Sequence, residues 1–209
     1  MGLILKWVDG DLELALWRID QVDAAVPDQP FFTAQDLREW EATHHEKRKR
    51  EWVASRAALR MGLGKNWEVL YLDNGKPYCR ESALSFSHCL PLAGALIHPE
   101  HAGFDIQLED EKLMKIRQRF AHPSELDDAA NSPNELAYVT ILWSAKEAVF
   151  KVFGEEFTFA EHIRIRAFQP GQSSLVADIE HRNIPYTVML RHMRVLNHHV
   201  VLVTKVEKA

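Results

Sequence analysis

The chain has 209 residues, of which 46% are hydrophobic and 26% are charged, and this composition is typical of a soluble globular protein. Its formal net charge of −5 argues against a surface that binds nucleic acid throughout. No apolar stretch reaches the ~18 residues of a membrane-spanning helix, and Cys79 and Cys89 form no CxxC pair. We therefore expect a cytoplasmic protein with neither a disulfide framework nor a membrane partner.

The first hundred residues are predicted to combine strands with one long helical region. The alternation of residues 12–19 indicates a strand. Residues 34–61 are rich in charge and nearly free of helix breakers, which predicts a helix that ends at Gly62 and Gly64. A turn is expected at Asp73-Asn74-Gly75, among short strands at residues 68–72, 84–88 and 92–97.

A polar break near residues 98–102 is the best internal boundary, which divides the chain into residues 1–101 and 102–209. After a strand at residues 103–108, Ser132-Pro133-Asn134-Glu135 has the form of a capping box with proline at the first helical position. This predicts a helix of about 21 residues that ends at Gly154. Because strands and helices mix without strict alternation, the expected fold class is α+β. The remaining strands are expected at residues 163–168, 175–180, 186–190 and 199–206.

The long helix carries the first candidate functional residues. Trp143, Glu147 and Lys151 are spaced by four, so they lie along one face. Lys146 lies about 100° round from Glu147, from where its side chain can reach a ligand over that face. The same spacing also fits an ordinary surface pair of Glu and Lys on a core helix, and taken alone it favours that interpretation.

The strand at residues 103–108 offers oxygen ligands. Alternate side chains of a strand share a face, so Asp105 and Gln107 point together while Phe104 and Ile106 point the other way. Mg²⁺ prefers oxygen ligands, and Asp105, Gln107 and Glu147 would supply three. An edge strand with a solvated polar face is the alternative for this pattern.

One further segment is a candidate for binding phosphate, and a basic run precedes it in the chain. Pro77 stiffens the turn that presents Lys76, and Ser87 and His88 end a strand with small polar groups. In the basic run at residues 46–56, Arg48 and Arg56 recur on one helical face. A solvated helix face is the ordinary interpretation of such a run, and the overall acidity opposes a nucleic-acid-binding module.

These segments, in their order along the chain, resemble the 4′-phosphopantetheinyl transferase superfamily. The resemblance is to its longer, surfactin-synthetase-activating type rather than to the short trimeric carrier-protein synthases. The pieces are the basic helix with Arg56, then GKP at residues 75–77, SFSH at 85–88, GFDIQ at 103–107 and WSAKEAVFK at 143–151.

The resemblance implies a fold and a reaction. It implies two similar α+β halves in one chain, with a ligand cleft between them that binds coenzyme A (CoA) and Mg²⁺. Members of the family transfer the 4′-phosphopantetheine group of CoA to a serine of an acyl or peptidyl carrier protein, in fatty-acid, polyketide or nonribosomal-peptide biosynthesis, and release 3′,5′-ADP. Because one chain would hold both halves, we expect a monomer.

The resemblance also implies roles for individual residues. Asp105 and Glu147 match the metal-binding acids, and Lys151 matches the lysine that approaches the diphosphate. We expect Glu147 to accept the proton of the attacking serine. The positions that match those holding the phosphates and adenine are Arg48, Arg56, Lys76, Ser87 and His88.

Two residues depart from the family pattern. Gln107 stands where an acid is usual, so we expect Mg²⁺ to bind weakly without CoA, whose phosphates supply the missing charge. Ser85 stands where an asparagine is common. Gln107 also supports the alternative function, a CoA-binding regulatory or scaffold relative without transferase activity, whereas the retained acids and lysines oppose it.

Overall fold

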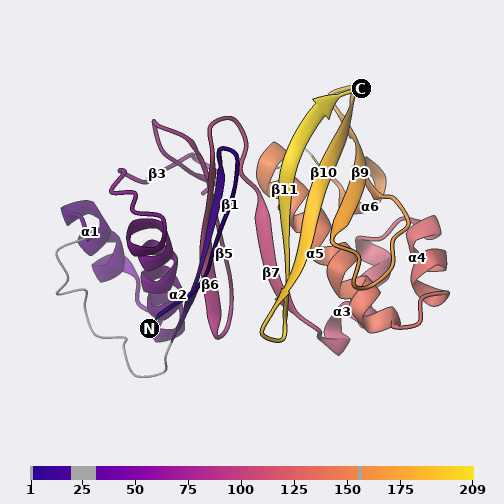
Figure 1. The fold of residues 1–209 in the computed structure, drawn as a ribbon, viewed down its shortest axis with the longest axis horizontal. Coiled ribbons are helices and arrows are strands. Elements are labelled where there is room, and N and C mark those ends of the chain that lie inside the picture. Colours follow the sequence, from indigo (N-terminus) through magenta and orange to yellow (C-terminus); the bar gives the residue numbers. More distant parts are fainter. Residues whose placement is uncertain (1, 20–31, 155–156) are drawn as a thin grey trace. The chain divides into compact units, whose positions relative to one another are not determined.

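The computed structural model describes residues 2–19, 32–154 and 157–209. The chain forms two compact units, which we call unit 1 (Met1–Ala102) and unit 2 (Gly103–Ala209). Each unit combines one antiparallel sheet with helices (Figure 1). The predicted α+β class is therefore confirmed.

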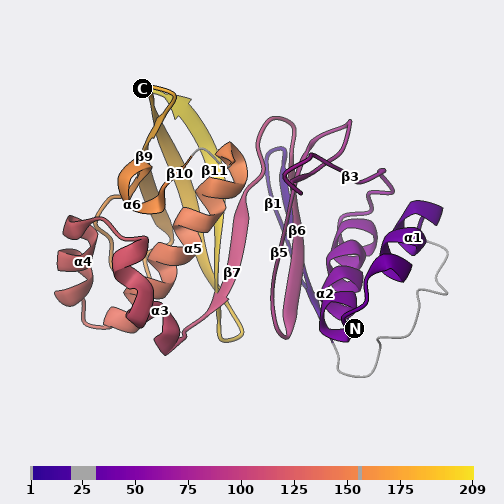
Figure 2. The ribbon, with the colours of Figure 1, turned by 180° about the vertical axis from the view of Figure 1, so that it is seen from behind.

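The sheet of unit 1 has six strands in the order β1-β2-β6-β5-β4-β3, and every neighbouring pair is antiparallel. Its helices are α1 (Ala34–Ala42) and α2 (Glu46–Ala57), which a π-helical turn at Ala58–Gly62 extends. Both helices lie on one side of the sheet (Figures 1 and 2). The strands are β1 (Gly2–Asp9), β2 (Leu12–Arg18), β3 (Leu70–Tyr71), β4 (Pro77–Tyr78), β5 (Ala83–Cys89) and β6 (Leu92–His98).

Small side chains let α2 approach this sheet closely. Ala54 and Ala57 of the helix pack in one buried cluster with Ala15, Ala93 and Ala95 of the strands. Alanine keeps the helix without side-chain entropy loss, and its short side chain brings the two backbones together. This packing fixes the position of α2 on the sheet, and with it the positions of Trp52 and Arg56.

The prediction of a single helix over residues 34–61 is wrong, because the first helix ends at Ala42 and the second begins at Glu46. Thr43 is the C-cap of α1, with extended backbone angles, and its hydroxyl donates to Glu39 O at 2.9 Å. A threonine side chain that bonds to the backbone of the preceding turn competes with helix continuation, and no glycine or proline marks the site. The strand β1 was not predicted at all, although Gly10, with φ of +57°, forms its turn into β2.

The sheet of unit 2 has five strands in the order β7-β11-β10-β9-β8, again all antiparallel. Its longest helix, α5 (Glu135–Phe153), packs on this sheet (Figure 2). The other helices are α3 (Glu111–Ile116), α4 (Pro123–Ala130) and α6 (Phe159–His162). The strands are β7 (Phe104–Leu108), β8 (Ile163–Ile165), β9 (Ser174–His181), β10 (Ile184–Val195) and β11 (His198–Lys208).

The predicted start of α5 needs correction. Asn134, not Ser132, is its N-cap, and the Asn134 side chain accepts from Ala137 N at 3.1 Å. The helix has 19 residues and ends at Gly154, as predicted, where φ is +97°. Only glycine adopts this angle readily.

The packing of α5 against β7 depends on Gly103. A Cβ atom at Gly103 would lie 2.1 Å from Ala148 O and 2.6 Å from a methyl carbon of Val152. The missing side chain therefore lets the start of β7 come close to the last turns of α5. This approach brings the residues that follow Gly103 within hydrogen-bonding distance of the helix.

Candidate functional site

Asp105 of β7 is held by two side chains of α5. Lys151 Nζ lies 2.9 Å from Asp105 Oδ1, and Ser144 Oγ donates to Asp105 Oδ2 at 3.2 Å. Lys151 Nζ also donates to Phe104 O at 2.8 Å. Asp105 is 7% exposed, so the solvated edge strand considered as an alternative is excluded for this residue. The carboxylate instead faces the helix.

Glu147 lies on the same face of α5, between Ser144 and Lys151 in sequence. Burial raises the pKa of Glu147, the negative charge of Asp105 raises it further, and Lys151 opposes the shift. A buried carboxyl group whose charge is disfavoured by a neighbouring carboxylate is a place where a cation or a proton is bound favourably. The four-residue spacing of Glu147 and Lys151 thus places both next to Asp105.

These acids fit a hard cation. The Asp105 and Glu147 carboxylates interact electrostatically, and Gln107 lies two residues along β7 from Asp105, on the same face of the strand. Carboxylate and amide oxygens are the ligands that Mg²⁺ prefers. Within the part of the chain that the structure describes, no group of three or more His, Cys, Asp or Glu residues that could hold a metal ion is found, so a metal held by Asp105 and Glu147 would need further ligands of another kind.

Lys146 lies elsewhere, and the expectation that it reaches a ligand beside Glu147 is wrong. Its side chain is fully buried, and Nζ lies 2.8 Å from Glu125 Oε2 of α4. Nζ also donates to Phe159 O at 2.8 Å and to Ile163 O. Burial lowers the pKa of Lys146, and Glu125 opposes that shift. The lysine therefore ties α5 to α4, α6 and β8.

A cavity of about 820 Å³ opens beside α2 in unit 1, and we call it the α2 cavity. Lys47, Arg48 and His88 lie in its wall and make it basic, with one buried acid, Glu51. Glu51 Oε1 lies 3.6 Å from His88 Nδ1 and 3.8 Å from Lys47 Nζ. The remaining lining residues are Thr43, Trp52, Ser55, Arg56, Tyr71, Gly75, Pro77, Phe86, Cys89 and Leu90.

Three of the predicted phosphate-binding residues take different positions around this cavity. His88 is exposed in its wall, whereas Ser87 is buried and is not among the lining residues. Lys76 lies between the lining residues Gly75 and Pro77, and partial burial lowers its pKa. The structure therefore places His88 and Arg48 in the wall of the same cavity, whereas Lys76 is not among the lining residues.

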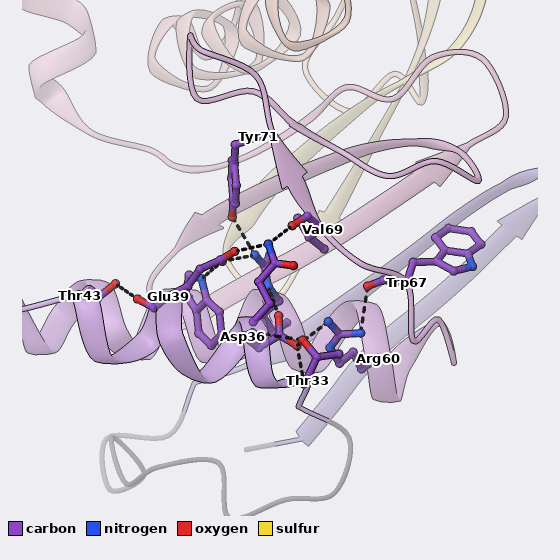
Figure 3. Close-up of polar contacts among 11 residues, drawn as sticks. Thr33, Asp36, Glu39, Thr43, Arg60, Trp67, Val69 and Tyr71 are labelled. Atoms are coloured by element: carbon purple, nitrogen blue, oxygen red, sulfur yellow. Dashed lines mark hydrogen bonds and ion pairs between the residues drawn. The ribbon is translucent and has the colours of Figure 1, made fainter.

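Arg56 lines the α2 cavity, but its guanidinium is already paired with acids of α1. Its Nε lies 3.0 Å from Asp36 Oδ1, and its Nη2 lies 2.8 Å from Glu39 Oε2. Nη2 also donates to Tyr71 OH at 2.8 Å (Figure 3). Neither acid was predicted, because no spacing rule relates α1 to a residue 17 or more positions further on. The aspartate at the third position after Thr33 was the one local signal, since it marks a capping box.

Comparison with known proteins finds a similarity for the C-terminal part. A family model described as the 4′-phosphopantetheinyl transferase superfamily matches residues 102–198, which include β7, α5 and the Asp105 cluster. No curated protein sequence matches the chain. Among residues 2–19, 32–154 and 157–209, no helix is long and apolar enough to cross a membrane.

Proposed function

We propose that this chain, whose residues 102–198 match the family model of the 4′-phosphopantetheinyl transferase superfamily, transfers 4′-phosphopantetheine from CoA to a carrier-protein serine. The products would be the modified acyl or peptidyl carrier protein and 3′,5′-ADP. The observation that carries the proposal is the contact of Asp105 with Lys151, beside a glutamate whose pKa is raised. This arrangement lies inside the segment that the family model matches.

Asp105, Glu147 and the amide oxygen of Gln107 would hold Mg²⁺. When bound, the ion neutralises charge on the phosphate oxygens during transfer. Lys151, with a side chain 25% exposed, offers a second positive charge to the diphosphate while Asp105 and Phe104 O fix its direction. Because Arg and Lys charges act strongly on phosphate in a partly buried site, the lysine contributes to binding and to leaving-group stabilisation.

Glu147 is the proposed general base. A raised pKa makes a carboxylate a better proton acceptor, provided that it is ionised at the working pH. The serine hydroxyl must lose its proton as its oxygen bonds to phosphorus and the bond to 3′,5′-ADP breaks. Glu147 accepts this proton, directly or through a water molecule.

The α2 cavity is the proposed site for the nucleotide end of CoA. Its wall presents Lys47, Arg48 and His88, and Lys76 lies between the lining residues Gly75 and Pro77. Several cations around one cavity complement the charges of a 3′-phosphate and a diphosphate. The exposed ring of Tyr71 in the same wall offers a face for a base to stack on.

The test is a pair of substitutions that change one carboxylate each. Glu147→Gln should abolish transfer while the protein stays folded, because the amide cannot accept the serine proton. Glu180→Gln, at an exposed position of β9, should leave the rate unchanged. Wild-type rates in Glu147→Gln would contradict the assignment. Binding of CoA without any transfer by the wild type would favour the alternative, a regulatory relative, for which Gln107 is the supporting observation.

A further inference from the structure

The α2 cavity has a feature that the proposed reaction does not require, namely an acid on α1 behind its wall. Glu39 is not itself a lining residue, yet one of its oxygens contacts two residues that are. Oε2 lies 2.8 Å from Arg56 Nη2 and accepts from Trp52 Nε1 at 3.3 Å. Its other oxygen, Oε1, accepts from Gln35 Nε2 at 3.1 Å. One carboxylate thus joins three side chains.

The guanidinium that Glu39 holds is surrounded by aromatic rings of the cavity wall. The Cζ atom of Arg56 lies 4.9 Å from the ring centre of Trp52 and 4.9 Å from that of Phe86. Tyr71 is placed by its hydroxyl, which accepts from Arg56 Nη2, and its ring centre is 5.9 Å from Cζ. Cation–π contacts favour a fixed guanidinium position when the group is desolvated, and Arg56 is 1% exposed. A displacement of Arg56 would therefore displace three aromatic rings of the cavity wall.

The helix that presents Glu39 is itself anchored. Thr33 and Asp36 form its capping box, and Asp36 also pairs with Arg60 of the π-helical turn. Gln35 Nε2 donates to Val69 O at 2.8 Å, next to β3 (Figure 3). The helix α1 is thus bonded both to α2 and to the residue that precedes the strand carrying Tyr71. These contacts on both sides of α1 hold Glu39 in place.

We propose that Glu39 is a positioning residue for the nucleotide site. Arg56 supports the aromatic side chains of the cavity wall and does not bind phosphate. Asp36 and Glu39 offset the charge of Arg56, so phosphate binding falls to Lys47, Arg48 and His88 of the cavity wall. Glu39 shapes the nucleotide site through its hydrogen bonds to Trp52 and Arg56, and Arg56 in turn fixes the position of Tyr71. This inference rests on the proposed function, because it assigns the cavity to a nucleotide.

The test shortens the side chain without changing its charge. Glu39→Asp withdraws the carboxylate by one methylene, so the contacts to Trp52 and Arg56 cannot both remain. Glu41→Asp, at an exposed position of the same helix, is the matched control. With 3′,5′-ADP as the calorimetric probe, we expect Glu39→Asp to weaken binding about tenfold, equivalent to ~1.4 kcal/mol. The control should bind like the wild type.

Kinetics separate positioning from a general loss of structure. With CoA as substrate, the KM of Glu39→Asp should rise while kcat at saturation stays near that of the wild type, because only binding of the nucleotide end is impaired. Unchanged or tighter binding of 3′,5′-ADP would overturn the inference, since tighter binding would mean that a freed Arg56 contacts phosphate. Failure of the wild type to bind 3′,5′-ADP would instead overturn the proposed function.

A second variant covers the case in which Glu39→Asp does not fold. Trp52→Phe removes the indole N–H that donates to Glu39 and keeps an aromatic ring in the wall. It should weaken binding of 3′,5′-ADP relative to the wild type, and wild-type affinity would contradict the proposal. Where Glu39→Asp does fold, the effect of Trp52→Phe should shrink in the Glu39→Asp background of a double-mutant cycle, because the contact is then already lost. Additive effects would contradict the proposal.

Discussion

Replacement of Lys146 by methionine tests how far α5 depends on its buried ion pair. Lys146 and Glu125 are both fully buried, and their charged atoms lie 2.8 Å apart. At this distance and an effective dielectric constant near 20, the attraction of two unit charges is roughly 6 kcal/mol before hydration is counted. Methionine has a similar length and fills the same space, but it leaves the Glu125 charge without its cation.

The expected loss is smaller than this attraction because Glu125 keeps other partners. Its oxygens still accept from His122 N and Ile165 N, both at 2.7 Å. In contrast, Phe159 O and Ile163 O lose their donor. Breaking a buried pair by removing one partner typically costs about 3–5 kcal/mol, and we expect a loss of that size in the free energy of unfolding.

The assay is urea unfolding followed by far-UV circular dichroism, with Lys205→Met as the control. Lys205 pairs with Glu207 on β11, but both side chains are about half exposed, so the same substitution there should cost less than about 1 kcal/mol. If Lys146→Met lost no more stability than Lys205→Met, the assignment of Lys146 as an internal anchor of α5 would be refuted.

The remaining predictions concern packing, titration and the metal. Gly103→Ala should destabilise the protein by roughly 1–3 kcal/mol in urea unfolding, since its Cβ would lie 2.1 Å from Ala148 O, whereas Gly2→Ala, with no atom within 4 Å, should not. Burial raises the pKa of Tyr138, so its contribution to stability is complete below the ordinary value of about 10 and is lost as pH rises. Unfolding midpoints from about pH 9 to 11 should therefore fall more for the wild type than for Tyr138→Phe, and parallel losses would contradict this. Calorimetry should show weak Mg²⁺ binding without CoA, because Gln107 lacks a charge worth roughly 4 kcal/mol at 4 Å, and tight binding would contradict the proposed ligand set.

Periodicity predicted the local geometry of the candidate site well. The four-residue spacing placed Glu147 and Lys151 on one helical face, and Gly154 marked the end of that helix. Alternation along the strand placed Asp105 and Gln107 on one side. The contact of Asp105 with Lys151, 46 residues apart, was not predicted, because spacing rules do not reach across elements and the family resemblance related Asp105 only to Glu147.

The partners of the buried cations could not be predicted from the sequence. The position of Lys146 on α5 follows from helical spacing, but the acid that pairs with it, Glu125, lies on α4. Arg56 was predicted to hold phosphate, but its guanidinium pairs with Asp36 and Glu39 of α1. In both cases the pairing is decided by tertiary packing, which removes the cation from water and so requires a counter-charge.

The most direct test of the central claim is transfer itself. An apo carrier protein is incubated with the wild-type chain, CoA and Mg²⁺, and its mass is measured, with a panel of fatty-acid, polyketide and nonribosomal-peptide carriers as substrates. The proposed function predicts that at least one carrier gains the mass of a phosphopantetheine group and that 3′,5′-ADP appears in equal amount. If no carrier in the panel gains this mass while the chain binds CoA, the chain is not the transferase that we propose.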